Sequence, residues 1–390
     1  MQVKPFRIEH YFAKHEFSAR YLLSSSDAES RTIQEVLDLE PGSHERLLRH
    51  WCGYTESPGA PWLRATIAGV YKNILPEQVL VVSSAEEGIL LVYNALLGAS
   101  DHAIVETPGF ESGLELARST GAEVSEWRRR PDLGWAHNVK DLEKLIRRNT
   151  KILYICTPHN PLGLLMPTNV LEEVVALCRD RGIILFCDEV FRELEHDPAT
   201  RLSAACELYE NAISLGSMSK SYGLPGLRLG WLVTRNASFL QRCLEIRYYT
   251  TICNSAPSEF LCDVALRHRQ VLIDRNLGIV RRNLPLLETF FQEHAKLFEW
   301  VKPDASPMCF PLFKGAPSAS QFCDDVVRDI HVMLLPGTVY DEPRHIRFGY
   351  GRKNMPEALA RLSSYLKSRV VSRPMSADRD FGRLRSEQEG

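Results

Sequence analysis

The sequence predicts an α/β protein built on a mostly parallel sheet with helices on both faces. From residue 79 onward, short apolar runs alternate with helical patterns. These runs are apolar on both faces, which is typical of parallel strands buried between two helical layers. The chain has 390 residues and 44% hydrophobic content, enough to bury a large core in two lobes. Strands are predicted at residues 79–83, 103–106, 152–156, 183–187, 212–215 and 229–234.

Composition excludes several classes of protein. The formal net charge is −2 and no basic block is interleaved with aromatic residues, so nucleic acid is not an implied partner. The ten cysteines include no C-x-x-C pair, which indicates reduced thiols rather than a disulfide framework or a metal site. Residues 1–12 lack the apolar core of a signal peptide, and no apolar run is long enough to span a membrane. We therefore expect a cytoplasmic location and no membrane partner.

Residues 1–45 are expected to form an irregular arm followed by one helix. Within the arm, residues 24–27 (Ser-Ser-Ser-Asp) predict a polar turn that caps the start of that helix. Tyr54 then opens a Pro-Gly loop ahead of a second helix, which contains Leu63 and Arg64. From its own surroundings, Tyr54 could serve either packing or binding.

The end of the first predicted strand opens a helix at Ser84, Ala85 and Glu86. Backbone N–H groups at a helix start lack intrahelical acceptors, so this turn can bind an anion. Ligands of parallel sheets bind at the carboxyl ends of strands, where this turn lies. Acidic residues such as Glu86 also stabilise a first helical turn through the helix dipole alone, so a structural role is open too.

Three later strand ends carry candidate binding residues. Phe110 follows the second strand in a Pro-Gly turn, where it could be either a ligand contact or a core aromatic. Asn160 lies in a turn that two prolines and a glycine make rigid, so its amide is held at a strand end. Asp188 ends a buried apolar strand, where a carboxylate is costly unless it has a partner.

Residues 217–231 bring together the groups that a phosphorylated aldehyde requires. Ser217 and Lys220 lie at the end of the strand that begins at residue 212, and Arg228 follows a Pro-Gly turn. Lys220 offers an amine for a Schiff base, while a hydroxyl and an arginine fork can hold a phosphate. A Ser-x-Ser-Lys sequence alone is common in exposed loops, so the argument depends on the other motifs.

The last third of the chain is expected to lead from a large lobe back to a smaller one. A short strand at residues 345–350 carries Arg347, and Arg344 and Arg352 lie close to it in the sequence. Each of these guanidinium groups could pair with a carboxylate. From residue 369 the chain is charged and poor in large apolar residues, so residues 369–390 are expected to be disordered. Helices are predicted at residues 241–275, 277–294 and 356–366.

Together these motifs resemble the class I/II aminotransferase family, whose members depend on pyridoxal 5′-phosphate (PLP) and have fold type I. The resemblance extends from about residue 20 to residue 368 and rests on six pieces in the family's order. It implies a three-layer α/β/α large domain at residues 46–275. It also implies a smaller α+β domain made of residues 276–368 together with the arm, residues 1–45. The six pieces are Tyr54, the Ser84 turn, Asn160, Asp188, Lys220 with Arg228, and Arg347.

The resemblance also implies a role for each candidate residue. Lys220 would carry the cofactor, Asp188 would keep its pyridine nitrogen protonated, and Asn160 would bond its 3′ oxygen. Tyr54 would cross a homodimer interface to the phosphate of the partner's cofactor. Phe191 stands where the family has a tyrosine that shares the 3′ oxygen, which is a departure. The remaining roles would be phosphate binding by Ser84, Ala85, Glu86, Ser217 and Arg228, ring stacking by Phe110, and substrate carboxylate binding by Arg347 with Ser25 close to it.

The leading functional interpretation is transamination between an amino acid and a 2-oxo acid, with Lys220 moving a proton. A second interpretation is a PLP-dependent cyclase, lyase or oxidase. Phe191 and the arm at residues 24–26 resemble the capreomycidine synthase branch, whose members cyclise a hydroxylated arginine. A third is a regulator that only binds PLP, against which the lack of a DNA-binding module ahead of residue 20 counts.

Overall fold

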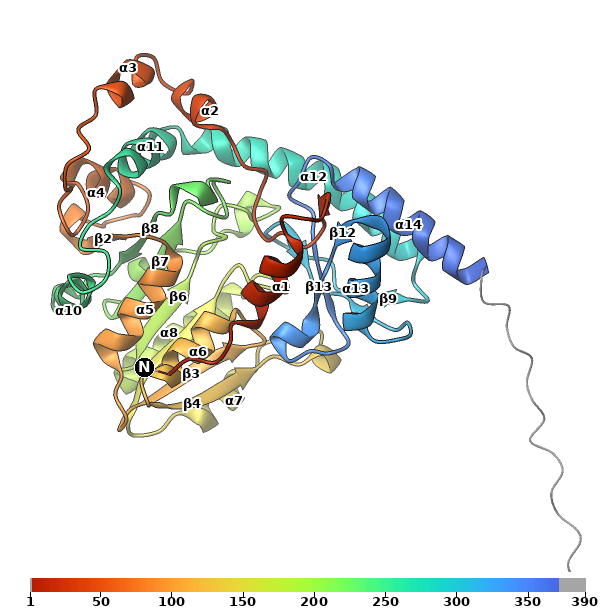
Figure 1. Cartoon of the computed structure of the whole chain (residues 1–390). Helices are drawn as coiled ribbons and strands as arrows, with labels where there is room; N and C mark the ends of the chain where they lie inside the picture. The colour runs from red at the N-terminus through yellow and green to blue at the C-terminus, as the bar shows by residue number, and fades with distance from the viewer. Residues whose placement is uncertain (1, 372–390) are drawn as a thin grey trace, which may run out of the picture.

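The computed structural model describes residues 2–371. Its centre is a seven-stranded sheet with the strand order β2-β8-β7-β6-β5-β3-β4 (Figure 1). β8 is antiparallel to both of its neighbours, and the other strands pair in parallel. The strands are β2 (Val79–Val82), β3 (His102–Thr107), β4 (Glu123–Arg128), β5 (Thr150–Cys156), β6 (Ile184–Asp188), β7 (Ala212–Ser217) and β8 (Gly230–Val233).

All six strands predicted from the sequence are confirmed, with ends that differ by at most two residues. The sequence did not predict β4, in which only Trp127 is buried. Within the described chain β4 pairs with β3 alone, so it is an edge strand with one side open to solvent. A half-exposed edge strand has no continuous apolar run, and this is why the pattern of the other strands did not reveal it.

Helices cover both faces of the sheet. Side chains of β6 alternate between the two layers: Leu185 packs with α8, and Phe186 packs with α5. This arrangement confirms the predicted three-layer α/β/α fold. One face is covered by α5 (Ala85–Leu96), α6 (Glu111–Ser119) and α10 (Ala237–Arg247), and the other by α7 (Val139–Leu145), α8 (Thr168–Arg181) and α9 (Ala205–Leu208).

A further hydrophobic cluster beside the sheet joins α4 (Pro61–Ala68) and α11 (Ala256–Arg267) to the start of α12 (Arg269–Glu293). The expectation of one helical stretch from 241 to 275 was wrong. The chain leaves the helix after Arg247 and re-enters it at Ala256, with Pro257 in the first turn of α11. Proline is tolerated there because the first turn has no intrahelical bond to lose.

The second, smaller part of the molecule is formed by the end of α12 and the residues that follow it. Leu272 and Leu277 of α12 pack in the cluster beside the sheet, while Leu287 and Phe290 pack in a separate cluster with α13 and α14. One helix therefore joins the two parts (Figure 1). The elements are β9 (Phe298–Glu299), β10 (Met308–Cys309), β11 (Leu312–Phe313), α13 (Ala319–Ile330), β12 (Val332–Met333), β13 (Leu335–Pro336), β14 (Ile346–Gly349) and α14 (Met355–Val371). Most of the predicted tail, residues 372–390, lies outside the described residues.

The amino-terminal arm crosses between the two parts of the molecule (Figure 1). The predicted helix start at residues 24–27 was wrong, because α2 begins only after Thr32, whose side chain forms a capping box with Glu35. Residues 24–27 instead run beside β14. A Cβ atom at Gly349 would lie 2.0 Å from the Ser25 carbonyl oxygen, so glycine permits this close approach. The arm contains α1 (Arg7–His15), β1 (Tyr21–Leu22), α2 (Ile33–Leu37) and α3 (Ser43–Leu48).

Two findings concern the chain as a whole. All ten cysteines lie in the described residues and are free thiols. Among residues 2–371, no helix combines the length and the apolar character that crossing a bilayer would need.

Candidate active site

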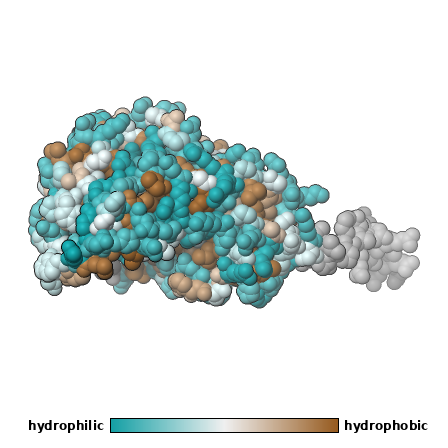
Figure 2. Space-filling view, turned by 90° about the horizontal axis from the view of Figure 1, so that it is seen from above, coloured by the Kyte–Doolittle hydropathy of each residue, from teal (hydrophilic) through white to brown (hydrophobic). Residues whose placement is uncertain are grey.

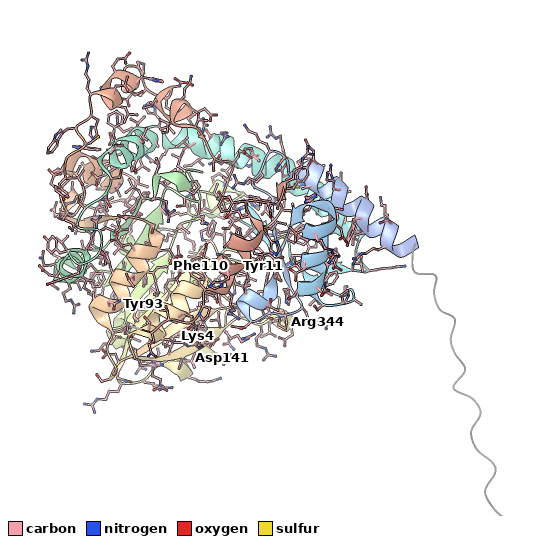
Figure 3. The ribbon with its side chains drawn as sticks, in the orientation of Figure 1. Lys4, Tyr11, Tyr93, Phe110, Asp141 and Arg344 are labelled. Carbon is pink, nitrogen blue, oxygen red and sulfur yellow. The ribbon has the colours of Figure 1, made fainter. Side chains whose placement is uncertain are left out.

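A cavity of about 450 Å³ lies at the carboxyl ends of the sheet strands, bordered by α1, the arm and β14. Tyr54 is the one predicted site residue that does not line it, and its side chain is 83% exposed. Of the competing arginines, Arg352 lines the cavity and Arg344 does not; Arg344 lies at a distance from Phe110 in Figure 3. The predicted residues that the structure brings together are Ser25, Ser84, Ala85, Glu86, Phe110, Asn160, Asp188, Phe191, Ser217, Lys220, Arg228 and Arg347.

One end of the cavity combines groups that can bind an anion. The N–H groups of Ala85 and Glu86 lie in the first turn of α5, where no intrahelical acceptor exists. The hydroxyl of Ser217 and the guanidinium of Arg228 border the same cavity. At Gly230 a Cβ atom would lie 3.0 Å from the Ala85 nitrogen, so glycine keeps β8 close to this turn. Backbone donors, a hydroxyl and an arginine together suit a phosphate group.

Lys220 follows β7 and projects its amine toward the arm. Its Nζ donates a hydrogen bond to Ser26 Oγ at 2.9 Å. Burial lowers the lysine pKa, and the nearby charge of Asp27 opposes this effect. A lowered pKa favours the neutral amine, which is the nucleophilic form. The sequence did not single out Ser26 as this partner, although it belongs to the serine run of the arm.

Asp188 ends β6 and is 5% exposed. Its Oδ1 accepts a hydrogen bond from the Val190 N–H at 3.1 Å, and its Oδ2 accepts one from the Tyr154 hydroxyl at 2.9 Å. Burial raises the pKa of the carboxyl, and these two bonds oppose the rise. Sequence analysis missed Tyr154, whose only signal is a hydroxyl within the otherwise apolar run of β5.

Arg347, on β14, is 2% exposed, and its guanidinium donates hydrogen bonds only to uncharged acceptors of the described chain. Its Nε and Nη2 donate to the Ser24 carbonyl at 3.1 and 2.8 Å, and its Nη1 donates to Asn160 Oδ1 at 3.2 Å and to the Tyr340 hydroxyl. Among the described residues, no carboxylate lies within 4 Å of it. A buried cation without a counter-ion is costly, so this position suits an anionic ligand. Ser24 and Tyr340 were not predicted.

Helix α1 borders the opening of the cavity. Its backbone N–H at Ile8 and the Nε of Arg7 are both bonded to the Glu111 carboxylate, at 2.9 and 2.7 Å. Phe12, on the same helix, lines the cavity and lies 5.9 Å from the Arg347 guanidinium carbon, within the range of a cation–π contact. The Phe110 ring lies near α1 in Figure 3. The helix therefore limits solvent access to Arg347.

Besides Asp188, four carboxylates line the cavity: Glu9, Glu16, Asp27 and Glu86. Only Asp27 forms an ion pair within the described chain, with Arg352 at 2.9 Å. Burial raises the pKa of Glu86 to about 6, while its hydrogen bond from a serine of α6 opposes the rise. Burial also raises the pKa of Glu16, and the neighbouring Asp27 adds to this effect. The side of the cavity toward α1 is therefore acidic.

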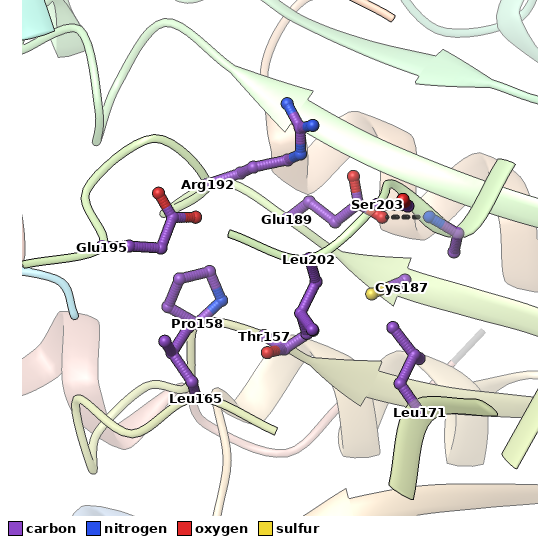
Figure 4. A pocket seen from close by; sticks show the side chains of 11 residues that line it. Thr157, Pro158, Leu165, Leu171, Cys187, Glu189, Arg192, Glu195, Leu202 and Ser203 are labelled. Carbon is purple, nitrogen blue, oxygen red and sulfur yellow. Dashed lines mark hydrogen bonds between the residues drawn. The ribbon is translucent and has the colours of Figure 1, made fainter. Parts of the chain in front are cut away.

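A second cavity, of about 10 Å³, lies beside Glu189, the residue that follows Asp188 (Figure 4). Glu189 Oε1 accepts hydrogen bonds from the Ala205 N–H at 2.7 Å and the Ser214 hydroxyl at 2.8 Å, while Oε2 has no protein partner. Burial raises its pKa to about 7, and Arg192 opposes the rise. The cavity has room for about one water molecule, so it is too small for a cofactor.

Several known proteins are similar to this chain. Capreomycidine synthase from Streptomyces vinaceus is 26% identical over 370 residues, which cover 94% of this chain and 95% of that protein. An aspartate aminotransferase from Thermotoga maritima is 25% identical over 326 residues, 81% of this chain and 84% of that enzyme. The structure of a PLP-dependent aminotransferase from Streptococcus suis has a TM-score of 0.89 at 28% identity and covers 94% of this chain and 99% of its own. The PLP-dependent cyclase OrfR has a TM-score of 0.86 at 26% identity, with 95% and 98% covered.

The match to a family is equally broad. Residues 22–362 match the family described as aminotransferase class I and II, which is most of the chain. The cofactor of this family is PLP, and the cavity contains an amine, an anion site and a buried carboxylate that fit it. The similar structures share the three-layer fold expected for PLP fold type I. The chain therefore belongs to the class I and II aminotransferase family of PLP-dependent enzymes.

Proposed function

We propose that the protein transfers the amino group of an amino acid to a 2-oxo acid. Members of its family act on amino and oxo acids, and the aspartate aminotransferase of Thermotoga maritima is one of its relatives. The observation that carries the proposal is that a single cavity is lined by Lys220, Asp188 and Arg347. An amine, an acid and an unpaired guanidinium are the groups needed to attach, activate and orient an amino acid.

Bound PLP supplies an aldehyde that accepts the amino group and a ring that stabilises negative charge on the substrate Cα. The anion site at the start of α5 would hold its phosphate, and Asp188, fixed by Tyr154, would hold a proton at the ring nitrogen. Arg347 would orient the substrate carboxylate through paired N–H donors. The neutral amine of Lys220 would take the Cα proton as a general base and return it as a general acid.

A panel of amino acids tests this function. We expect purified holoenzyme, supplied with one amino acid and 2-oxoglutarate, to release the matching 2-oxo acid together with glutamate in equal amounts, as measured by mass spectrometry. The physical reason is that the amino group leaves one substrate and must be carried to the other. A product with altered bonds at Cβ or Cγ, or formed only in air, would instead support the cyclase, lyase or oxidase.

One observation favours that second candidate, acting on an amino acid with an arginine-like side chain. Glu9, Glu16 and Glu86 present carboxylates to the cavity, and no lysine or arginine of the described chain lies within 4 Å of them. Unpaired carboxylates in a partly buried site favour a cationic ligand. Phe191 at the cavity wall, and similarity to capreomycidine synthase and to the cyclase OrfR, also support it.

The variant Glu16→Gln is expected to raise KM for arginine about tenfold while leaving KM for citrulline nearly unchanged. Citrulline has almost the same shape as arginine but carries no charge, so only the charge contact is removed, worth about 1.5 kcal/mol. Because the pKa of Glu16 is raised and that of Glu86 is about 6, arginine affinity should fall as the pH drops below 6 and these carboxylates are protonated. Steady-state kinetics from pH 5 to pH 8 measure both effects.

A matched control is Glu115→Gln on α6, where the carboxylate pairs with Arg118 outside the cavity. This variant should leave both KM values unchanged. Equal losses for arginine and citrulline in Glu16→Gln would show that the carboxylate does not recognise a cationic side chain.

We also propose that the protein is a homodimer, as is typical of its family. Exposed apolar side chains gather in two segments, residues 48–54 and 248–252. The hydrogen bond from Thr55 Oγ1 to the Asn254 carbonyl shows that these segments are neighbours. Among them, Trp51 is 77% exposed and Tyr249 is 92% exposed. Exposed apolar patches of this kind mark interaction surfaces. Several separate hydrophobic areas interrupt the hydrophilic surface in Figure 2. In the dimer, Tyr54 would contact the cofactor phosphate of the other subunit.

The free thiols support the proposed cytoplasmic location.

Replacing Trp51 with glutamate is expected to convert the dimer to a monomer of about 44 kDa, because a carboxylate would be desolvated in the interface. Sedimentation equilibrium measures the mass of each species. The control Leu133→Glu changes another exposed apolar side chain, in the loop after β4, and should leave the mass unchanged. If wild type sediments as a monomer, the proposed interface is wrong.

A further inference from the structure

The orientation of the Asn160 amide is fixed by two side chains that come from the other part of the molecule. Asn160 is 6% exposed and lines the cavity. Its Oδ1 accepts hydrogen bonds at 3.2 Å from Arg347 Nη1 and at 3.2 Å from the Tyr340 hydroxyl. Arginine has no acceptor, so the amide must turn its oxygen, and not its nitrogen, toward Arg347. Both N–H donors of Asn160 Nδ2 are then left for a ligand.

Tyr340 lies at the centre of this arrangement. Its hydroxyl accepts a hydrogen bond from Arg347 Nη1 and donates one to Asn160 Oδ1. The residue ends a short 3-10 helix, η5 (Gly337–Tyr340), and its ring packs edge-on against Phe310 with centroids 5.4 Å apart. Burial raises its pKa to about 12, so the hydroxyl stays protonated and remains a donor near neutral pH. Tyr340 does not line the cavity, and so it acts through its two neighbours.

The Tyr340 hydroxyl matters more in this chain because the cavity is lined by Phe191, which has no hydroxyl of its own. A phenylalanine there offers no hydrogen bond toward the cofactor's 3′ oxygen, so Asn160 is left as the donor. The strength of that donor depends on its other bonds, because donors that bind an amide oxygen polarise the group and strengthen its N–H groups. Two donors, one of them charged, therefore make Asn160 a stronger partner for a negatively charged oxygen.

We propose that Tyr340 is a positioning residue that couples the cofactor's 3′ oxygen, through Asn160, to the substrate carboxylate site at Arg347. The proposal rests on the function proposed above, in which Arg347 faces the carboxylate, and on the role at the cofactor's 3′ oxygen that the family resemblance implies for Asn160. A carboxylate that binds Arg347 competes for Nη1, which the hydroxyl and the amide oxygen share. Binding at one site is thus transmitted to the donor at the other through two hydrogen bonds.

The test is the pH titration of the visible absorbance of bound PLP in wild type and in Tyr340→Phe. Loss of the hydroxyl weakens Asn160 as a donor, which disfavours the ionised 3′ oxygen, so the titration midpoint should rise by about half a pH unit. Saturating pentanoate, a carboxylate that has no amine, should shift the midpoint in wild type. In Tyr340→Phe this shift should be at most half as large.

Tyr350→Phe is the matched control. Tyr350 is also fully buried, but its hydroxyl donates to the Ser306 carbonyl at 2.9 Å, away from the cavity. This control should lose some thermal stability and keep both the wild-type midpoint and the wild-type response to pentanoate. A purely structural Tyr340 would behave in the same way, and that result would overturn the proposal.

Other outcomes separate this inference from the function on which it rests. A wild-type protein without a visible PLP band would overturn the proposed function and this inference with it. A wild-type protein that shows the PLP band but no response to pentanoate would overturn this inference alone. A wild-type response that Tyr340→Phe retains in full would overturn the coupling alone. If Tyr340→Phe does not fold, Tyr340→3-fluorotyrosine keeps the side chain's shape and strengthens the donor, so the midpoint should fall. A midpoint that rises or stays unchanged with this residue would contradict the proposal.

Discussion

Replacing Lys220 with alanine is expected to lower turnover by at least about 10⁴-fold. The substitution removes the amine that we propose attaches the cofactor and also moves the Cα proton as a general base, and proton transfer alone contributes about 10²- to 10⁴-fold. The lowered pKa of Lys220 supports both roles, since the neutral amine is the form that attacks an aldehyde and accepts a proton. Rapid mixing of holoenzyme with its best substrate measures the rate in a single turnover.

Three further experiments make this result specific to Lys220. Borohydride reduction of wild-type holoenzyme, followed by peptide mapping, should place the pyridoxyl mass on Lys220 and on no other residue. The variant Lys302→Ala, which removes an exposed lysine paired with Glu288, should keep full activity. Added methylamine should restore part of the activity of Lys220→Ala, because a small amine can replace the missing base. A label on another lysine would refute the assignment.

Replacing Asp188 with alanine is expected to lower kcat/KM by about 10²- to 10³-fold, the range found when one preorganised electrostatic contact is lost. The carboxylate is held in place by Val190 and Tyr154, so a proton on the ring nitrogen would meet a fixed negative charge. The variant should still bind PLP, since Lys220 and the anion site at the start of α5 remain. Equilibrium titration with PLP and steady-state kinetics measure the two quantities separately.

Tyr154→Phe is the matched comparison for this prediction. It removes one hydrogen bond from Asp188 Oδ2 and keeps the charge, so kcat/KM should fall by only about tenfold, the worth of one hydrogen bond to a charged group. Asp188→Asn, which keeps the shape without the charge, should resemble Asp188→Ala. Unimpaired turnover in Asp188→Ala would show that the carboxylate does not serve the ring nitrogen.

The fold could be predicted wherever the pattern of apolar residues is continuous. The six strands that were predicted are buried on both faces, and this burial gives continuous apolar runs such as Leu-Val-Val and Ile-Leu-Tyr-Ile-Cys. The edge strand β4 was missed because most of its side chains are partly or fully exposed, so its sequence has no continuous apolar run. The helix break after Arg247 was missed because its two ends are bonded to residues far away in the sequence: Arg247 donates to the Ser57 carbonyl, and the Asn254 carbonyl accepts from Thr55.

Much of the candidate site could be predicted because the ends of parallel strands meet at one edge. Asn160, Asp188 and Lys220 each lie at or just after the end of a strand, and fold topology alone brings them together. Tyr340 gave no such signal, since its role depends on a contact with a residue 180 positions earlier. Glu9 of α1 and Glu16, which follows that helix, were missed for the same reason. In the sequence they are ordinary polar positions, and only the packing of α1 places them at the cavity.

The pairing of the arm with distant strands sets an order in which the molecule can be completed as it is synthesised. Lys220 and the residues of the proposed anion site fall between positions 84 and 230, and the sheet that carries them is complete at Val233. The arm emerges from the ribosome first, yet its partners come last. Arg347, which bonds to Ser24, follows it by 323 residues, and Arg352, which pairs with Asp27, follows it by 325 residues. A nascent chain can therefore fold the sheet that carries Lys220 before the arm can pair with β14, so the substrate side of the proposed site would be completed only near the end of translation.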